Sequence, residues 1–143
     1  MLKPKIAVLT GFGFNCEKET YHVFKKSGGD PEYVHINDFI YKDKNMNDYH
    51  ILVFIGGFSF GDHIAGGRVL AVKFKYKLQD QFHSFLDKDK LIIGICNGFQ
   101  TLVKLGILPG NDEYKENQVV TLTHNDHPGY RDDWIYLKCN TKS

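Results

Sequence analysis

The chain has 143 residues, of which 42% are hydrophobic and 24% charged, and its formal net charge is +1. These values favour one domain, residues 1–143, with a core of its own, and give no bulk charge that would select nucleic acid or a membrane as partner. The longest apolar runs are too short to span a bilayer, and the N-terminus has no signal-peptide core. The three cysteines, at positions 16, 96 and 139, fit neither a disulfide framework nor a zinc site. We therefore expect a cytoplasmic protein without a metal.

The first half of the chain alternates apolar runs with polar or amphipathic segments. Short apolar runs predict strands over residues 5–10 and 51–55, and residues 31–36 are a further strand candidate. Between the first two, a helix is expected to begin after Asn15 as its N-cap and to stop at the glycines 28 and 29. Residues 37–49 are polar and predict a short helix or a loop.

The second half begins with a predicted long helix over residues 68–85. Its apolar positions form one stripe: Leu70, Phe74, Leu78, Phe82 and Phe85. A strand over residues 91–95 and a helix over residues 99–105 follow. After a Pro-Gly turn at residues 109–110, two further strands are predicted over residues 119–123 and 134–139.

Strands that alternate with helices predict an α/β fold with a largely parallel sheet and helices on both faces. In such sheets, ligands bind at the carboxyl ends of the strands. Gly56 and Gly57 follow one predicted strand and Cys96 follows another. We therefore expect these residues to meet at one edge of the sheet.

The Gly-x-Cys-x-Gly pattern at residues 94–98, which we call the elbow, is typical of a sharp strand-to-helix turn that exposes a nucleophile. The field of a helix N-terminus favours the thiolate of Cys96, and the backbone N–H of Asn97 would point toward a developing oxyanion. The alternative is a buried, unreactive cysteine at a helix start.

Two segments together resemble class I (triad-type) glutamine amidotransferases. Gly-Gly-Phe-Ser-Phe-Gly-Asp at residues 56–62 and Gly-Ile-Cys-Asn-Gly-Phe-Gln at residues 94–100 are most similar to the glutaminase subunit or domain of phosphoribosylformylglycinamidine synthase, an enzyme of purine biosynthesis. The Asn-Cys-Glu run at residues 15–17 and residues 125–138 also resemble this branch, so the resemblance covers essentially the whole chain. It implies a flavodoxin-like sheet.

The resemblance implies that Cys96 attacks the carboxamide of glutamine, releases ammonia and leaves a γ-glutamyl thioester that water hydrolyses. The oxyanion would lie between the N–H groups of Gly57 and Asn97. The substrate-binding positions that it implies are Gly57, Phe58, Gln100, Asn125 and Tyr130. Cys16, the competing thiol, is interpreted as structural.

The family also has a histidine and a glutamate in a late His-Pro-Glu-like segment. After Cys96 this chain has only His124 and His127, and the pair His127-Pro128 is followed by Gly129. We interpret His127 as a loop residue. We therefore expect the chain to be the N-terminal portion of a glutaminase domain, incomplete at its C-terminus and with little or no activity alone. The implied partners are glutamine and a synthetase subunit or domain, and only the synthetase is expected to hold ATP and Mg²⁺.

Two alternatives remain open from the residues. One is an α/β cysteine enzyme of the amidase, peptidase or deglycase type, in which His124 or His127 would serve as the base. The other is a non-catalytic, glutaminase-like module that binds and regulates a synthetase.

Overall fold

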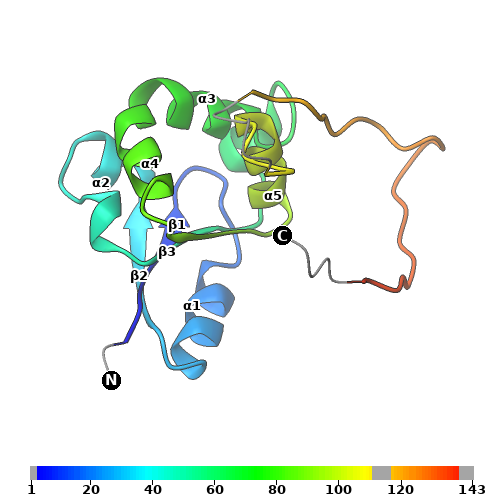
Figure 1. Ribbon diagram of the computed structural model, residues 1–143. Coiled ribbons are helices and arrows are strands. Elements are labelled where there is room, and N and C mark those ends of the chain that lie inside the picture. Colours follow the sequence, from blue (N-terminus) through cyan, green and yellow to red (C-terminus); the bar gives the residue numbers. More distant parts are fainter. Residues whose placement is uncertain (1–2, 111–116, 139–143) are drawn as a thin grey trace.

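Four parallel strands form the central sheet of the protein. Figure 1 shows the computed structural model, which describes residues 3–110 and 117–138. The strands lie in the order β2-β1-β3-β4. Their bounds are β1 (Lys5–Thr10), β2 (Asp30–His35), β3 (Ile51–Phe54) and β4 (Leu91–Gly94). This order is the start of the flavodoxin-like order, and it confirms the predicted α/β class.

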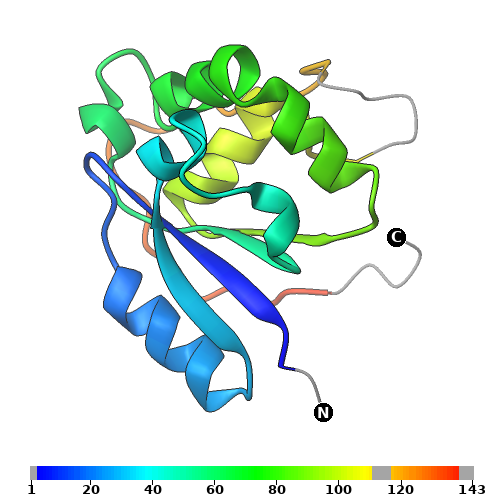
Figure 2. The same cartoon turned by 90° about the vertical axis from the view of Figure 1, so that its left-hand side faces the viewer.

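Helices cover the two faces of the sheet unequally, as Figures 1 and 2 show. Among the described residues, helix α1 (Glu17–Lys26) is the one helix on the first face. The opposite face carries α2 (Ile36–Ile40), α3 (Arg68–Lys77), α4 (Gln79–Leu86) and α5 (Asn97–Leu105). Two short 3₁₀ turns, η1 (Met46–Asp48) and η2 (Ser59–Asp62), lie in the loops.

The strand pleat divides the core between these faces. Along β1, Ala7 and Leu9 join the large cluster under the four helices, whereas Ile6 and Val8 join a smaller cluster on the α1 side. This period of two is what a strand buried on both faces requires. The large cluster includes the buried rings of Phe39, Phe54, Phe74, Phe82 and Phe85.

The predicted helix over residues 68–85 is wrong in one respect, because it is two helices that meet at Leu78. Leu78 leaves the helical region with φ −125° and ψ 7°. A straight helix over this range would be about 27 Å long, whereas a four-residue strand such as β3 spans roughly 13 Å. The break keeps α4 over the sheet, and the whole predicted stripe is buried: Leu70, Phe74, Leu78, Phe82 and Phe85.

The predicted N-cap of α1 is also wrong. The cap position is Cys16, with φ 67° and no side-chain capping bond. Asn15 is held one residue earlier, because its backbone N–H donates to the carbonyl of Gly56 at 3.0 Å. The pairing of this loop with residues 56–58 therefore sets the helix start, and side-chain capping does not.

The strands predicted over residues 119–123 and 134–139 are not formed in the described part, residues 117–138, and Cys139 lies outside it. An apolar run becomes a strand only when a neighbour pairs with its N–H and C=O groups. This segment extends away from the sheet (Figure 1), and Trp134 and Tyr136 are fully exposed. The apolar residues of this segment are the reason that strands were predicted there. The prediction fails because no strand in the described part of the chain pairs with the segment.

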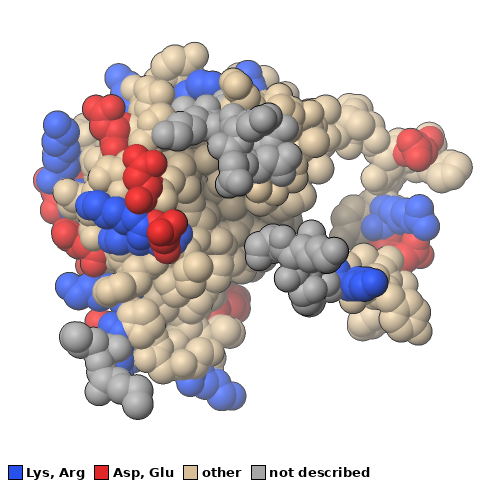
Figure 3. Space-filling view, viewed as in Figure 1, with Lys and Arg blue, Asp and Glu red and all other residues tan. Residues whose placement is uncertain are grey.

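Charges of both signs are interspersed on the face shown in Figure 3. Ion pairs such as Lys44 with Glu32, and Lys25 with Asp30 at 3.5 Å, join neighbouring elements of the surface. Within residues 3–110 and 117–138, the helices are all too short or too polar to cross a bilayer.

Candidate active site

Cys96 lies at the tip of the strand-to-helix turn that the elbow pattern predicts. It follows β4 and forms the N-cap of α5, with φ 53° and ψ −110°. The ladder with β3 continues to Ile95, whose N–H donates to the carbonyl of Phe54 at 2.9 Å. Positive φ in a residue with a side chain is strained, and such strain is common at catalytic nucleophiles. Cys96 is exposed, so the alternative of a buried, unreactive cysteine is excluded.

The two glycines of the elbow are required by close packing. A Cβ on Gly98 would lie 1.9 Å from the carbonyl oxygen of Phe54, and one on Gly94 would lie 2.5 Å from a methyl group of Leu102. Both distances are far below van der Waals contact. The glycines therefore let the first turn of α5 approach the ends of β3 and β4, which fixes the position of Cys96.

Residues 56–62, which we call the glycine loop, lie beside the nucleophile. A Cβ built on Gly56 would make ordinary contact with the Cβ of Cys96, at 3.6 Å. Gly57 has φ 118° and pairs with Phe14 in an isolated antiparallel bridge. The hydrogen bonds of this bridge come from the neighbours: Asn15 N–H to Gly56 O at 3.0 Å, and Phe58 N–H to Gly13 O at 2.7 Å. In this pattern the N–H of Gly57 points away from the partner segment.

The side chain of Asn97 joins the elbow to the glycine loop. It is only 2% exposed, and its Oδ1 accepts the N–H of Ser59 at 3.1 Å. Its Nδ2 donates to Asp62 at 2.9 Å and to Oε1 of Gln100 at 3.0 Å. These bonds orient the carboxamide of Gln100 so that its Nε2 points away from Asn97. The elbow pattern predicts only a backbone role for Asn97, and it does not single out Asp62.

An apolar rim borders this edge of the sheet. Phe58, predicted to bind substrate, has an exposed side chain (67%). Next to it, a shallow groove is lined by Phe12, Gly13, Phe60, Gly61, His63 and Val69. The rings of Phe12 and Phe60 are 5.5 Å apart, so the base of the glycine loop packs against the β1–α1 loop.

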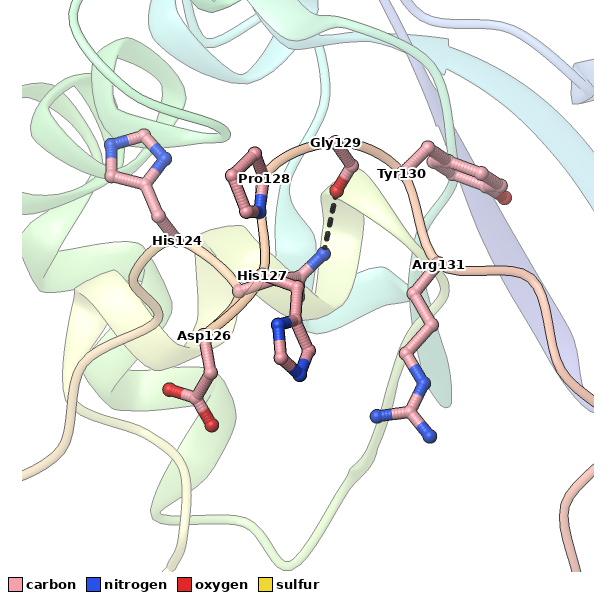
Figure 4. A pocket seen from close by; sticks show the side chains of 8 residues that line it. His124, Asp126, His127, Pro128, Gly129, Tyr130 and Arg131 are labelled. Atoms are coloured by element: carbon pink, nitrogen blue, oxygen red, sulfur yellow. Dashed lines mark hydrogen bonds between the residues drawn. The ribbon is translucent and has the colours of Figure 1, made fainter.

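Asn125 and Tyr130 lie on a separate loop. Figure 4 shows the hollow formed by residues 124–131, in which Asn125 Nδ2 donates to the carbonyl of Gly129 at 3.1 Å. Tyr130 is 94% exposed. Among the described residues, the hydrogen bonds of residues 117–138 are all local to that segment. The structure thus brings Cys96, Gly57, Asn97 and Gln100 together, with Phe58 on the same glycine loop as Gly57. It places Asn125 and Tyr130, with His124 and His127, on the separate loop.

Cys16 is the other described thiol, and it is exposed at the start of α1. Its carbonyl accepts the hydroxyl of Thr20 at 2.7 Å, which stabilises the first turn of the helix. Within residues 3–110 and 117–138, no cluster of three or more His, Cys, Asp or Glu side chains could hold a metal ion.

Groups with shifted pKa values lie away from the elbow. The Lys44 ammonium and the Tyr49 hydroxyl both donate hydrogen bonds to Glu32, and these bonds lower the pKa of its carboxyl group, with Lys44 having the larger effect. Desolvation lowers the pKa of Lys90, which precedes β4 and so lies at the opposite edge of the sheet. These shifts concern stability and not the chemistry at Cys96.

The chain is similar to known proteins over nearly its whole length. The family model described as a CobB/CobQ-like glutamine amidotransferase domain matches residues 3–143. The chain is 45% identical, over 139 residues, to the phosphoribosylformylglycinamidine synthase subunit PurQ of Methanococcus maripaludis, and the match covers 96% of the chain and 50% of that relative. It is 43% identical to the subunit of the same name from Dehalococcoides mccartyi, over 98% of the chain and 54% of that relative.

A solved structure of PurLQS from Thermotoga maritima contains a similar chain, with a TM-score of 0.63 and 34% identity. The match covers 75% of this chain and 46% of that one. The chain therefore spans about half the length of the curated relatives that it matches.

Proposed function

The chain belongs to the CobB/CobQ-like glutamine amidotransferase family, and from this premise we propose that it is the nucleophile-bearing part of a PurQ-type glutaminase. In this role it supplies the nucleophile for the hydrolysis of glutamine to glutamate and ammonia in purine biosynthesis, and with no His-Pro-Glu segment to supply the base we propose that the 143-residue chain has little or no activity alone. The observation that carries the proposal is the strained, exposed Cys96 beside the glycine loop.

The reaction uses the thiol of Cys96 and two backbone N–H groups, one from the elbow and one from the glycine loop. A general base accepts the thiol proton, and the sulfur of Cys96 bonds to the carboxamide carbon of glutamine, while the C=O electron pair moves to oxygen. The backbone N–H groups of Gly57 and Asn97 donate to this oxyanion. Breakage of the C–N bond, with return of the proton to nitrogen, releases ammonia. Water then cleaves the thioester, which gives glutamate and the free thiol.

Gln100 is proposed to donate to the bound glutamine, since its Oε1 accepts a bond from Asn97 and its Nε2 points elsewhere. Phe58 is proposed to border the same pocket. Asn125 and Tyr130 are proposed to hold the amino-acid end of glutamine when their loop approaches the sheet edge. This part of the proposal rests on the family resemblance.

The synthetase subunit of the same pathway is the proposed partner. The similarity to a chain of the Thermotoga maritima PurLQS structure and the subunit name of the relatives support it. ATP and Mg²⁺ are proposed to act in that partner. Co-elution with a PurL-type synthetase on size exclusion would support this pairing, whereas separate elution at micromolar concentrations of both would contradict it.

A chloroketone analogue of glutamine tests the proposed chemistry, because binding in a glutamine site brings its electrophilic carbon to the thiol and accelerates alkylation there over that of other exposed thiols. We expect peptide mass spectrometry to find Cys96 labelled at least ten times faster than Cys16, with protection by glutamine. Cys96→Ser is the control and should abolish this labelling. Equal labelling of both exposed thiols, without protection, would refute a glutamine site and favour the cysteine-enzyme or non-catalytic alternatives.

A further inference from the structure

We propose that Asp62 is a positioning residue for the oxyanion hole, because it fixes the distance between the elbow and the glycine loop. This inference rests on the proposed function. It concerns the separation between the backbone N–H groups of Gly57 and Asn97, which lie on different segments of the chain.

The carboxamide of Asn97 has its hydrogen-bonding capacity filled. Its oxygen accepts from Ser59, and its two amide hydrogens are directed to Asp62 and to Gln100. A flipped amide would place the NH₂ group against the N–H of Ser59, so only one orientation is satisfied. The residue that supplies one oxyanion donor is thus held by its own side chain.

Asp62 is the charged member of this network. Its Oδ1 accepts from Asn97 at 2.9 Å and from the N–H of Gly67 at 3.0 Å, and its Oδ2 lies 3.2 Å from the same Asn97 nitrogen. Hydrogen bonds to a carboxylate are stronger than those between neutral groups. Asp62 therefore joins the glycine loop, the start of α3 and the first residue of α5.

The backbone that presents Asp62 is strained. Phe60, Gly61 and Asp62 all have positive φ, of 53°, 68° and 49°. For residues with a side chain this conformation is unfavourable, and it persists only where surrounding contacts impose it. The Phe60 ring packs on Phe12, while the Asp62 carboxylate is held by Asn97 and Gly67. The strained backbone thus directs the carboxylate toward Asn97.

The two ends of the glycine loop are consequently anchored in different ways. At Gly57, the bridge to the β1–α1 loop fixes one donor. At Asp62, the carboxylate fixes the loop to Asn97, which carries the other donor. Loss of the Asp62 charge should loosen the second anchor, so that the glycine loop, and with it the N–H of Gly57, can move relative to the N–H of Asn97, while Cys96 and Asn97 keep their place between Gly94 and Gly98.

The test compares two probes of Cys96 in the 143-residue chain. The γ-aldehyde analogue of glutamine adds reversibly to the thiol, with a new S–C bond and an oxygen that must enter the oxyanion hole. Iodoacetamide alkylates the same thiol without an oxyanion. The variant is Asp62→Asn, and the matched control is Asp43→Asn, which removes the same charge from an exposed position.

We expect Asp62→Asn to weaken aldehyde binding by roughly 10-fold or more, since loss of a whole donor costs about 10²–10³ in rate. The iodoacetamide rate at Cys96 should change less than about 2-fold, and Asp43→Asn should change neither value. Equal aldehyde affinity in Asp62→Asn and wild type, or an equal loss with both probes, would overturn the positioning role.

Asp62→Glu keeps the charge but moves the carboxylate, and it is the variant to score if Asp62→Asn does not fold. We expect Asp62→Glu to bind the aldehyde several-fold more weakly than wild type, and wild-type affinity would count against the role. If the wild-type chain does not bind the aldehyde at Cys96, the proposed function itself fails, which is a different result from a failure confined to Asp62.

Discussion

Replacement of Gly98 by alanine should destabilise the protein, although the same change in most helices stabilises it. Gly98 is the second residue of α5 and is buried. Alanine is favoured over glycine inside a helix by about 0.5–1 kcal/mol. The structure predicts the opposite sign here, because the added methyl group would lie 1.9 Å from Phe54 O and 2.4 Å from Phe54 C.

The magnitude follows from the movement that the methyl group demands. Ordinary contact begins near 3.4 Å, so the helix and the end of β3 must separate by about 1.5 Å. Overpacking typically costs about 1–3 kcal/mol, and the obstacle here is backbone, which cannot rotate away. After the helix-propensity gain is subtracted, we expect the free energy of unfolding to fall by about 2 kcal/mol.

Urea denaturation followed by circular dichroism measures this change, and Gly28→Ala is the control. Gly28 has φ +92° but nothing within 4 Å of a built Cβ, so only the conformational cost of about 1–2 kcal/mol applies. Gly98→Ala should also slow chloroketone labelling of Cys96 in the folded protein, whereas Gly28→Ala should not. A Gly98→Ala chain as stable as wild type would refute the close approach of α5 to Phe54.

Two further predictions concern the core and the pH dependence of stability. Phe74→Ala should lower the free energy of unfolding by about 3–5 kcal/mol, because this ring is fully buried and its centre lies 4.8 Å from that of Phe54. The control is Tyr76→Ala, since the Tyr76 side chain is 75% exposed. It should change the free energy of unfolding by less than about 0.5 kcal/mol in the same urea titration. Glu32 has its pKa lowered from the ordinary value of 4.5, mainly by Lys44, so its contribution is present above pH 4.5 and is lost as the pH falls through the folded value. The stability difference between wild type and Glu32→Gln, measured from pH 7 to pH 3, should therefore shrink in acid, and a difference independent of pH would contradict this assignment.

The parts of the fold that sequence patterns predicted are those decided by local burial. The four strands and the elbow were predicted within one or two residues. For β1 and β3 the reason is that each is an apolar run buried by its neighbours. The break at Leu78 could not be predicted, since its apolar stripe continues through it. It depends on the distance that the helices must cover, which is a property of the sheet and not of residues 68–85.

In the candidate site, too, the features set by neighbouring residues could be predicted, and those set by distant residues could not. The pattern at residues 94–98 predicted the exposed nucleophile, because only glycine fits beside Phe54 O. The role of the Asn97 side chain could not be predicted, because its partners Ser59 and Asp62 are more than 30 residues earlier in the chain. The strands predicted over residues 119–123 and 134–139 failed for a related reason, since pairing requires a neighbour that the run itself does not specify.

Phe54 explains why the elbow is formed even though residues 117–138 do not pack on the sheet. Its ring lies 4.8 Å from that of Phe74 and 6.2 Å from that of Phe82, inside the core under the helices. Its carbonyl accepts the N–H of Ile95 and touches the position that a Cβ on Gly98 would take. The position of Cys96 is therefore set by a residue that packs in the core under the helices, among Phe74 and Phe82. Substitutions in the loop at 124–131 should accordingly alter the binding of glutamine analogues without altering the alkylation of Cys96 by iodoacetamide.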